Sequence, residues 1–197
     1  VCDLIQTGPF GSQLKADEYV YGGVAVINPT HFTAGIIVPN PDVSVSSEVA
    51  QRLSRHALRK GDVITARRGI LGSCAVVTEV DLPAICGTGS AILRPNNTII
   101  PEFLAHVLTT RRCRQDLELV GVGATMVSIN STMLSRLRFP RPTTEQQEAA
   151  VDKTSTDISR IDELITESED LIALSQERRA ALIAAAVTGQ IDVRTTA

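Results

Sequence analysis

Short apolar runs bounded by Pro, Gly and Asn follow one another through the first 142 residues. Runs of this length predict buried strands, whereas longer stretches with apolar residues on one face predict helices. The predicted strands are Val24–Ile27, Gly35–Val38, Asp62–Ala66, Ser73–Thr78, Ala91–Arg94 and Arg136–Phe139. The predicted helices run from Ser46 or Ser47 to Leu58 and from Pro101 to about Leu119, and the predicted loops include Pro83–Gly89 and Val122–Asn130. Because strands and helices alternate without a regular βαβ rhythm, we expect an α+β domain with a mixed, twisted sheet or partial barrel.

The pattern changes after Pro140 and Pro142. From Thr143 to Val187 the sequence contains neither Pro nor Gly, and Gly189 then provides a typical C-terminal stop. This predicts one long helix, capped by one of the two threonines at its start. Helices of globular domains usually run roughly 8–20 residues, so we expect another surface to pack along this one.

Apolar residues recur along the long helix at alternating steps of three and four, which is the spacing of a coiled-coil seam. The seam residues are Val151, Ile158, Ile161, Ile165 and Ile172, and Thr154 and Ser168 interrupt them. A second apolar row lies beside the seam at Leu164, Leu171, Leu174 and Leu182. We therefore expect a compact domain at 1–142, a pairing helix at 143–189 and a short tail at 190–197, with the direction of the partner helix left open.

The net charge of −3 divides unevenly between these parts. Residues 1–142 contain 14 Lys and Arg against 11 Asp and Glu, whereas residues 143–197 contain 5 against 11. A basic domain attracts anions such as nucleic acid, and an acidic helix repels them. If the chain binds DNA, we expect the first part and not the helix to do so.

The sequence contains no recognisable catalytic or metal-binding motif. The four cysteines form no CxxC pair and the three histidines have no ligand spacing, so we expect reduced thiols in a cytoplasmic protein and no bound metal. No phosphate-binding GK[ST] motif, GxSxG elbow or HExxH pair occurs. No apolar run reaches the length of about 18 residues that a membrane span requires. We expect a protein that is not an enzyme.

Several motifs in a fixed order resemble the specificity subunit of type I restriction–modification systems. The motifs are Gly8–Lys15 (GPFGSQLK), Gly61–Gly72 (GDVITARRGILG), Gly123–Leu137 (GATMVSINSTMLSRL), Pro140–Gln147 (PRPTTEQQ) and Ala185–Val193 (AAVTGQIDV). The last two flank the long helix. Each motif is weak alone, but their order along nearly the whole chain identifies the family.

The resemblance implies a role for each part of the chain. Residues 1–142 would be a target recognition domain that reads one half of a bipartite site in double-stranded DNA. The long helix would be a spacer that sets the distance to a second recognition domain, either by self-association or by pairing with another half-subunit. The subunit would bind no cofactor and would position methyltransferase (modification) and restriction subunits, which use S-adenosylmethionine, ATP and Mg²⁺.

The chain differs from the usual family pattern of two recognition domains and two helices. It carries one of each, which leaves two possibilities open: a natural half-subunit that dimerises, or the C-terminal half of a longer chain. A symmetric pair would read a palindromic bipartite site, and a tandem chain would read two unrelated halves.

DNA recognition needs phosphate contacts for position and base contacts for sequence. From their chemistry and their place in loops, the candidate DNA-binding residues are Ser12, Gln13, Lys15, Arg67, Arg68, Thr125, Ser128 and Asn130. Asn130 has a second possible role as the cap of a helical turn through Leu134. We expect Phe10 to anchor its loop in the core rather than to stack on a base. We also expect the basic cluster of Arg111, Arg112 and Arg114 to be balanced by the dipole of a helix end and by solvent.

A different class of function stays open as the alternative. The chain would then be a coiled-coil scaffold whose helix drives assembly and whose compact domain binds protein rather than DNA. Salt-dependent DNA affinity distinguishes the two readings.

Overall fold

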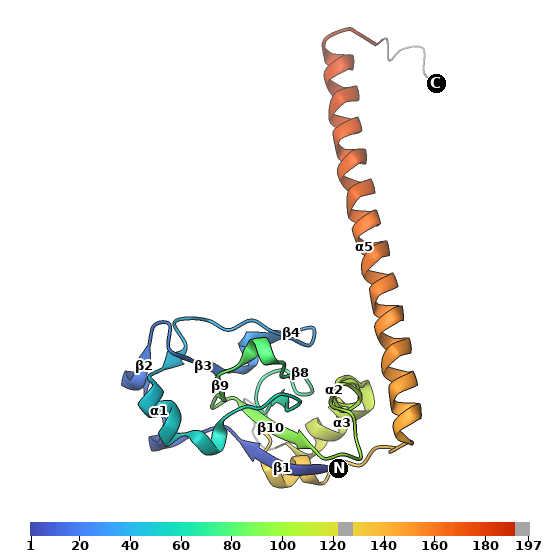
Figure 1. Cartoon of the computed structure of the whole chain (residues 1–197). Coiled ribbons are helices and arrows are strands. Elements are labelled where there is room, and N and C mark those ends of the chain that lie inside the picture. Colours follow the sequence, from blue (N-terminus) through green and yellow to red (C-terminus); the bar gives the residue numbers. More distant parts are fainter. Residues whose placement is uncertain (122–127, 192–197) are drawn as a thin grey trace. The chain divides into compact units, whose positions relative to one another are not determined.

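The computed structural model describes residues 1–121 and 128–191. The chain divides into two compact units, Val1–Val151 and Asp152–Ala197. The first unit contains all strands and the short helices, and the second consists of the greater part of one long helix (Figure 1). This is the mixed α+β architecture that the sequence predicts.

The central sheet of the first unit, sheet A, is antiparallel and has the order β1-β10-β7-β8. Its strands are β1 (Cys2–Thr7), β10 (Ser90–Pro95), β7 (Val63–Ala66) and β8 (Cys74–Val76). Side chains on β7 alternate between two cores, because Val63 faces the helices and Ile64 faces the other sheet. Both faces of this strand are buried, which explains why Val63, Ile64 and Ala66 do not alternate with exposed polar residues.

The second sheet, sheet B, has the order β2-β6-β3-β9 and combines antiparallel with parallel pairing. Its strands are β2 (Tyr19–Val20), β6 (Ser44–Val45), β3 (Val24–Ile27) and β9 (Ala84–Cys86), and a separate small hairpin consists of β4 (Phe32–Thr33) and β5 (Ile36–Ile37). The parallel β3–β9 pair makes this sheet mixed, as predicted.

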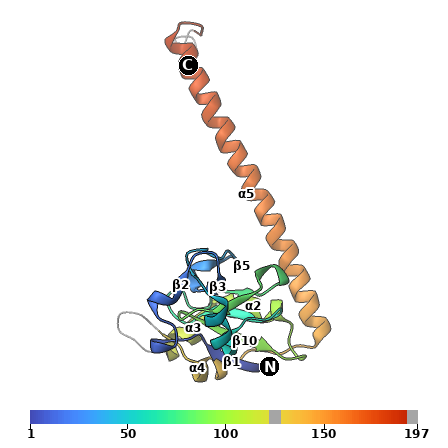
Figure 2. The ribbon, with the colours of Figure 1, turned by 60° about the vertical axis from the view of Figure 1, so that its left-hand side comes forward.

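Short helices cover sheet A on the side away from sheet B (Figure 2). The α-helices of the chain are α1 (Ser47–Arg52), α2 (Pro101–Thr109), α3 (Arg111–Val120), α4 (Ser131–Ser135) and α5 (Thr144–Val187). The 3₁₀ turns are η1 (Gly11–Gln13), η2 (Ala16–Glu18), η3 (Pro29–His31), η4 (Ser54–His56) and η5 (Glu79–Asp81). Leu104, Leu108 and Leu117 fill the core between the helices and sheet A, whereas α1 packs over the apolar cluster beside sheet B.

Two helical predictions need correction. The segment predicted as one helix from Pro101 to about Leu119 is two helices, because Thr110 adopts an extended conformation and its hydroxyl accepts a hydrogen bond from the Cys113 amide. The segment predicted to continue to Leu58 ends its α-helix at Arg52 and continues as the 3₁₀ turn η4. Ser46 caps α1 through the Val49 amide, as predicted.

The strand predictions were right for the interior of the fold and wrong at its margins. Val24–Ile27 is found as predicted, but Gly35–Val38 shrinks to the two residues of β5 and Arg136–Phe139 is not a strand. Conversely, β9 lies in the predicted loop Pro83–Gly89, where pairing with β3 satisfies its backbone. The opening residues form β1, an edge strand of sheet A that the apolar pattern did not predict.

Helix α5 begins and ends as the sequence predicts. Thr143 is its cap: the Thr143 hydroxyl accepts from the Gln146 amide, and the Gln146 side chain accepts from the Thr143 amide. Gly189 follows its last turn with a φ of 73°. In the part of the chain that the structure describes, no helix is both long and apolar enough to cross a membrane.

Candidate nucleic-acid interface

Two of the predicted DNA-binding loops leave sheet A at the same end. Thr7 of β1 pairs with Ala91 of β10, and Ser90 pairs with Ala66 of β7. The loop after β1 therefore starts beside the loop after β7. Backbone hydrogen bonds fix this junction, since the Gly8 amide donates to the Ser90 carbonyl at 2.9 Å and the Arg67 amide donates to the Gly89 carbonyl at 2.9 Å. We call this end of the sheet the arginine end.

Arg67 and Arg68 form the basic centre of the arginine end. Arg68 pairs with Ser128 in an isolated antiparallel bridge, and the Ile129 amide donates to the Arg67 carbonyl at 3.0 Å. The Arg67 guanidinium reaches the Ser128 hydroxyl, with 3.5 Å between Nη2 and Oγ. The structure thus brings together three predicted site residues, although Arg67 and Ser128 are 61 positions apart in the sequence.

Within residues 1–121 and 128–191, no carboxylate forms an ion pair with Arg67. Burial lowers the pKa of the Arg67 guanidinium, and the neighbouring charge of Arg68 acts in the same direction. An arginine stays protonated in proteins despite such a shift, so the lowered pKa marks a site where an anion would be stabilised. Among the described residues, the buried Arg67 Nε and Ser90 Oγ have no hydrogen-bond partner, and both atoms belong to the arginine end.

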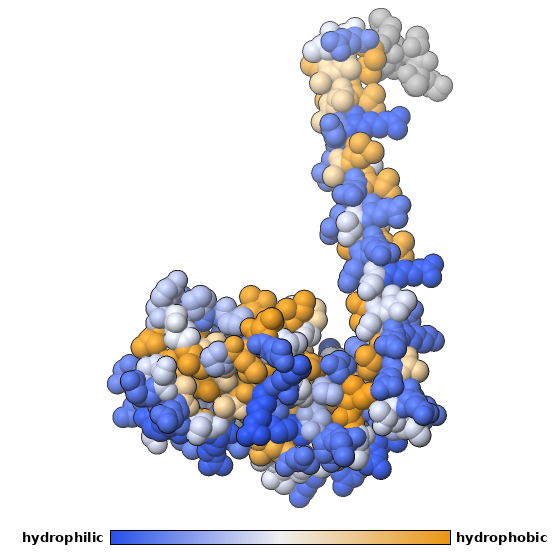
Figure 3. Space-filling view, viewed as in Figure 1, coloured by the Kyte–Doolittle hydropathy of each residue, from blue (hydrophilic) through white to orange (hydrophobic). Residues whose placement is uncertain are grey.

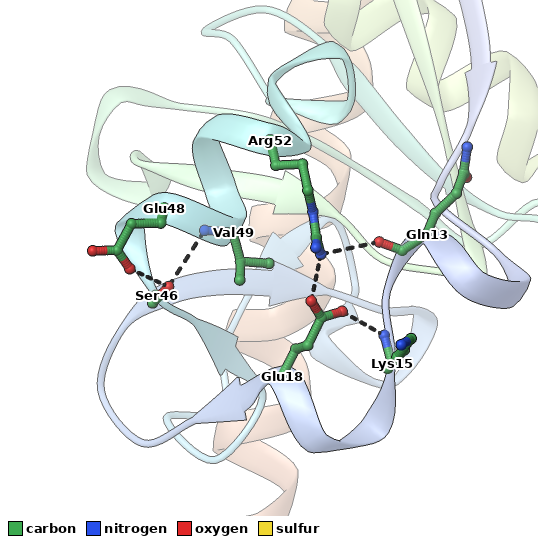
Figure 4. A network of polar contacts seen from close by, with 7 residues as sticks. All are labelled: Gln13, Lys15, Glu18, Ser46, Glu48, Val49 and Arg52. Carbon is green, nitrogen blue, oxygen red and sulfur yellow. Dashed lines mark hydrogen bonds and ion pairs between the residues drawn. The ribbon is translucent and has the colours of Figure 1, made fainter.

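Hydrogen bonds within the first loop, Gly8–Lys15, and from α1 hold this loop in place. Figure 4 shows the contact with α1. The Gln13 side chain accepts from the Phe10 amide at 3.2 Å, and Arg52 of α1 donates to the Gln13 carbonyl at 3.3 Å. Arg52 also binds the Glu18 carboxylate, which accepts from the Lys15 amide. These contacts lower the pKa of Glu18, the Lys15 amide more than Arg52. Gln13 therefore shapes the loop, while Ser12 and Lys15 are exposed on it.

Phe10 does not anchor its loop in the core, contrary to the prediction. Its side chain is 61% exposed, and Leu14 occupies the buried position instead, at 8%. The sequence offered two apolar residues in this loop, and only packing decides which one is buried. Phe10 therefore presents an aromatic ring on the loop that starts at the arginine end.

The basic cluster of Arg111, Arg112 and Arg114 also needs correction. These residues lie in the first turn of α3, where the helix dipole disfavours positive charge, so the dipole does not balance them. Arg114 packs against Gly72, since a Cβ built on Gly72 would lie 2.7 Å from the Arg114 Cγ. Arg114 thus lies beside the loop after β7. This contact could not be predicted from the sequence, because Arg114 and Gly72 are distant along the chain.

The remaining predicted site residues have different outcomes. Thr125 lies outside the described residues. The Asn130 side chain accepts from the Met133 amide at 2.9 Å and caps α4, which is the structural role left open for it. Its side chain is exposed and beside Ser128, so the cap does not remove it from this surface.

The buried cysteines of the described part of the chain are not activated thiols. Burial raises the pKa of the Cys74 thiol to about 12 and that of the Cys113 thiol to about 11, and thiols with raised pKa values are poor nucleophiles. Within residues 1–121 and 128–191, no group of three His, Cys, Asp or Glu residues is placed to hold a metal ion.

In the second unit, α5 carries an exposed apolar stripe (Figure 3). The predicted seam residues Ile158, Ile161, Ile165 and Ile172 are 47–58% exposed, and the second row is exposed as well. Val151, at the junction of the two units, is half-buried. Exposed apolar stripes of this length are typical of a helix that pairs with another surface.

Comparison with known proteins finds specificity subunits of type I restriction enzymes among the relatives in sequence. The StySPI specificity subunit of Salmonella potsdam is 26% identical over 57% of this chain and 24% of its own length. The MjaIX specificity subunit of Methanocaldococcus jannaschii is 22% identical over 77% of this chain and 34% of its own length. The chain therefore matches about a quarter to a third of the length of these relatives.

Solved structures share the fold. A chain from a type I R-M system studied for its complex assembly and conformational transition aligns with a TM-score of 0.72 at 22% identity, covering 94% of this chain and 43% of that one. The HsdS subunit from Thermoanaerobacter tengcongensis aligns with a TM-score of 0.63 at 21% identity, covering 96% of this chain and 46% of that one.

The family assignment rests on the greater part of the sequence. Residues 1–173 match the profile of the family described as Type I restriction modification DNA specificity domain. The homologues are specificity subunits, which are non-catalytic. The chain therefore belongs to the family of type I restriction–modification DNA specificity domains.

Proposed function

We propose that this chain reads one half of a bipartite site in double-stranded DNA through the arginine end of sheet A. The observation that carries the proposal is the convergence of Arg67, Arg68 and Ser128 beside the start of the first loop. Guanidinium groups bind phosphates and the edges of guanine bases, and hydroxyl groups bind phosphates. The further candidate contacts to DNA are Phe10, Ser12, Gln13, Lys15, Arg114 and Asn130, and Thr125 stays a candidate from its chemistry alone.

The long helix serves as a spacer in this proposal. Its exposed seam pairs with the helix of a second copy or of another half-subunit, which brings a second recognition domain to the same DNA molecule. The acidic charge of residues 143–197 disfavours contact with DNA, so the helix sets a distance rather than reading sequence. The chain positions methyltransferase and restriction subunits, and these bind S-adenosylmethionine, ATP and Mg²⁺.

The first prediction concerns the double substitution Arg67→Ala/Arg68→Ala. We expect the affinity for specific DNA to fall several-fold or more. The plot of log affinity against log salt should become less steep, with its negative slope smaller in magnitude by about 2, because two cationic contacts are removed. Fluorescence anisotropy titrations at two or more salt concentrations, with the modification subunit present, measure both quantities.

Arg59→Ala/Lys60→Ala is the matched control. It removes two adjacent cations from the opposite end of the same strand, because these residues precede β7 and Arg67 follows it. An equal loss of affinity in both double variants would argue for diffuse charge rather than a site. Wild-type protein that forms a stable complex without any salt-dependent DNA affinity would instead favour the scaffold function.

A further inference from the structure

Gln147 is the one buried residue of the fully described helix α5, with none of its surface exposed. Both of its amide N–H groups and its amide oxygen are hydrogen-bonded. The side-chain oxygen accepts from the Ile100 amide at 2.9 Å, and the nitrogen donates to the carbonyls of Thr98 at 3.2 Å and Pro142 at 3.0 Å. Gln147 therefore joins the beginning of α5 to two other segments of the first unit, of which it is itself a part.

The segment that Gln147 holds is the direct continuation of β10. Thr98 and Ile100 lie between the end of β10 at Pro95 and the start of α2. The other end of β10, at Ser90, belongs to the arginine end and pairs with Ala66, next to Arg67. A single strand, paired on both edges by β1 and β7, thus runs from the arginine end to the anchor of α5.

A strand held on both sides in a sheet is a stiff element, and its length of about 3.3 Å per residue is fixed by backbone geometry. A long polar side chain with every donor and acceptor satisfied has a single orientation, because each alternative leaves a buried group unpaired. Together these features make a rigid connection between the candidate DNA-reading surface and the beginning of α5.

We propose that Gln147 is a positioning residue that fixes the spacing between the two half-sites, acting through β10 and without touching DNA. This inference rests on the proposed function, because spacing has meaning only if two recognition domains read one DNA molecule. Loss of the Gln147 contacts frees the first turn of α5 from the continuation of β10. The half-site bases are then read as before, but at more than one separation.

The test uses the full chain in complex with its modification subunits. The complex methylates DNA of random sequence with S-adenosylmethionine, and sequencing that detects methylated bases gives the half-site bases and the spacing in one experiment. For wild type we expect one dominant spacing. For Gln147→Ala and Gln147→Glu we expect the preference over neighbouring spacings to fall by about tenfold, as the loss of buried hydrogen bonds suggests, with the half-site bases unchanged. Gln51→Ala, an exposed glutamine of α1, is the control and should keep the wild-type spacing.

Each other outcome is decisive. Wild-type complex that methylates no defined sequence would overturn the proposed function, which is separate from the role of Gln147. Hydrogen exchange at the Ile100 amide shows whether the contact with residue 147 is lost in each variant. Variants that have lost this contact and still keep a single spacing would overturn the inference. Loss of half-site specificity together with spacing, or failure of both variants to fold by circular dichroism, would make Gln147 a general structural residue and overturn it as well.

Discussion

Asp62 and Arg94 form the most buried ion pair recorded in the described part of the chain. The Asp62 side chain is 1% exposed, and Arg94 binds it through two nitrogens at 2.7 and 2.8 Å. The Asp62 carboxylate also accepts from the Arg59 amide, and the pairing raises the pKa of Arg94. At the scale of single residues, this pair joins the turn before β7 to β10 at the end of sheet A opposite the arginine end.

Removing one partner leaves a buried charge without compensation. We expect Arg94→Ala to lower the free energy of unfolding by about 3–5 kcal/mol, measured by urea denaturation of the full chain. The exposed pair of Lys60 and Glu79 provides the comparison. Lys60→Ala should cost about 0–1 kcal/mol, and equal losses in the two variants would show that burial does not strengthen the inner pair.

His56 makes stability depend on pH. Its side chain is buried, and burial followed by the charge of Arg55 lowers its pKa below the ordinary value of 6.5. Gln6 lies 3.0 Å from its Nδ1. A lowered pKa in the folded state means that the unfolded chain binds the proton more readily, so stability is present above about pH 6.5 and is lost as the pH falls. We expect unfolding midpoints to decrease between pH 7 and 5, and His56→Gln to flatten this part of the profile. A profile identical to wild type in the variant would assign the pH dependence to other groups.

At the scale of elements, α5 is the part that the sequence predicted most completely. The Thr143 cap, the unbroken helix and the stop at Gly189 follow from local chemistry, and they are found where the pattern indicated. The sequence also predicted which side of α5 would pair with another helix. Apolar residues at alternating steps of three and four define one side of a helix, whatever surface covers that side. Pairing itself stays a prediction.

Ile161→Asp tests the seam. If the helices pair, the substitution places an unpaired charge in an apolar interface, and we expect self-association to weaken by at least about 100-fold. Sedimentation velocity of wild type and variant measures the change. Ser159→Asp adds the same charge on the opposite side of the helix and should leave the association intact. A monomeric wild type would contradict self-association, and equal masses for wild type and Ile161→Asp would contradict pairing through this row.

At the scale of the whole molecule, the sequence predicted the class of the fold, the family and most inner strands, but not how distant segments meet. Val24–Ile27 was predictable because an apolar run between turn residues has few alternatives. β9 was not, because Ala84–Cys86 is a short segment between Pro83 and Gly87 that becomes a strand only by pairing with β3. The break at Thr110 and the exposure of Phe10 likewise depend on which neighbours are packed alongside.

The candidate site divides in the same way. The sequence by itself determined which residues carry suitable chemistry, because Arg67, Arg68 and Ser128 lie in polar loops between apolar runs. Only the tertiary structure decided that they meet, that Arg114 lies against Gly72, and that Gln147 fastens α5 to the continuation of β10. Local periodicity sets the conformation of an element, whereas strand order and buried side-chain contacts are non-local and form only when the whole domain packs.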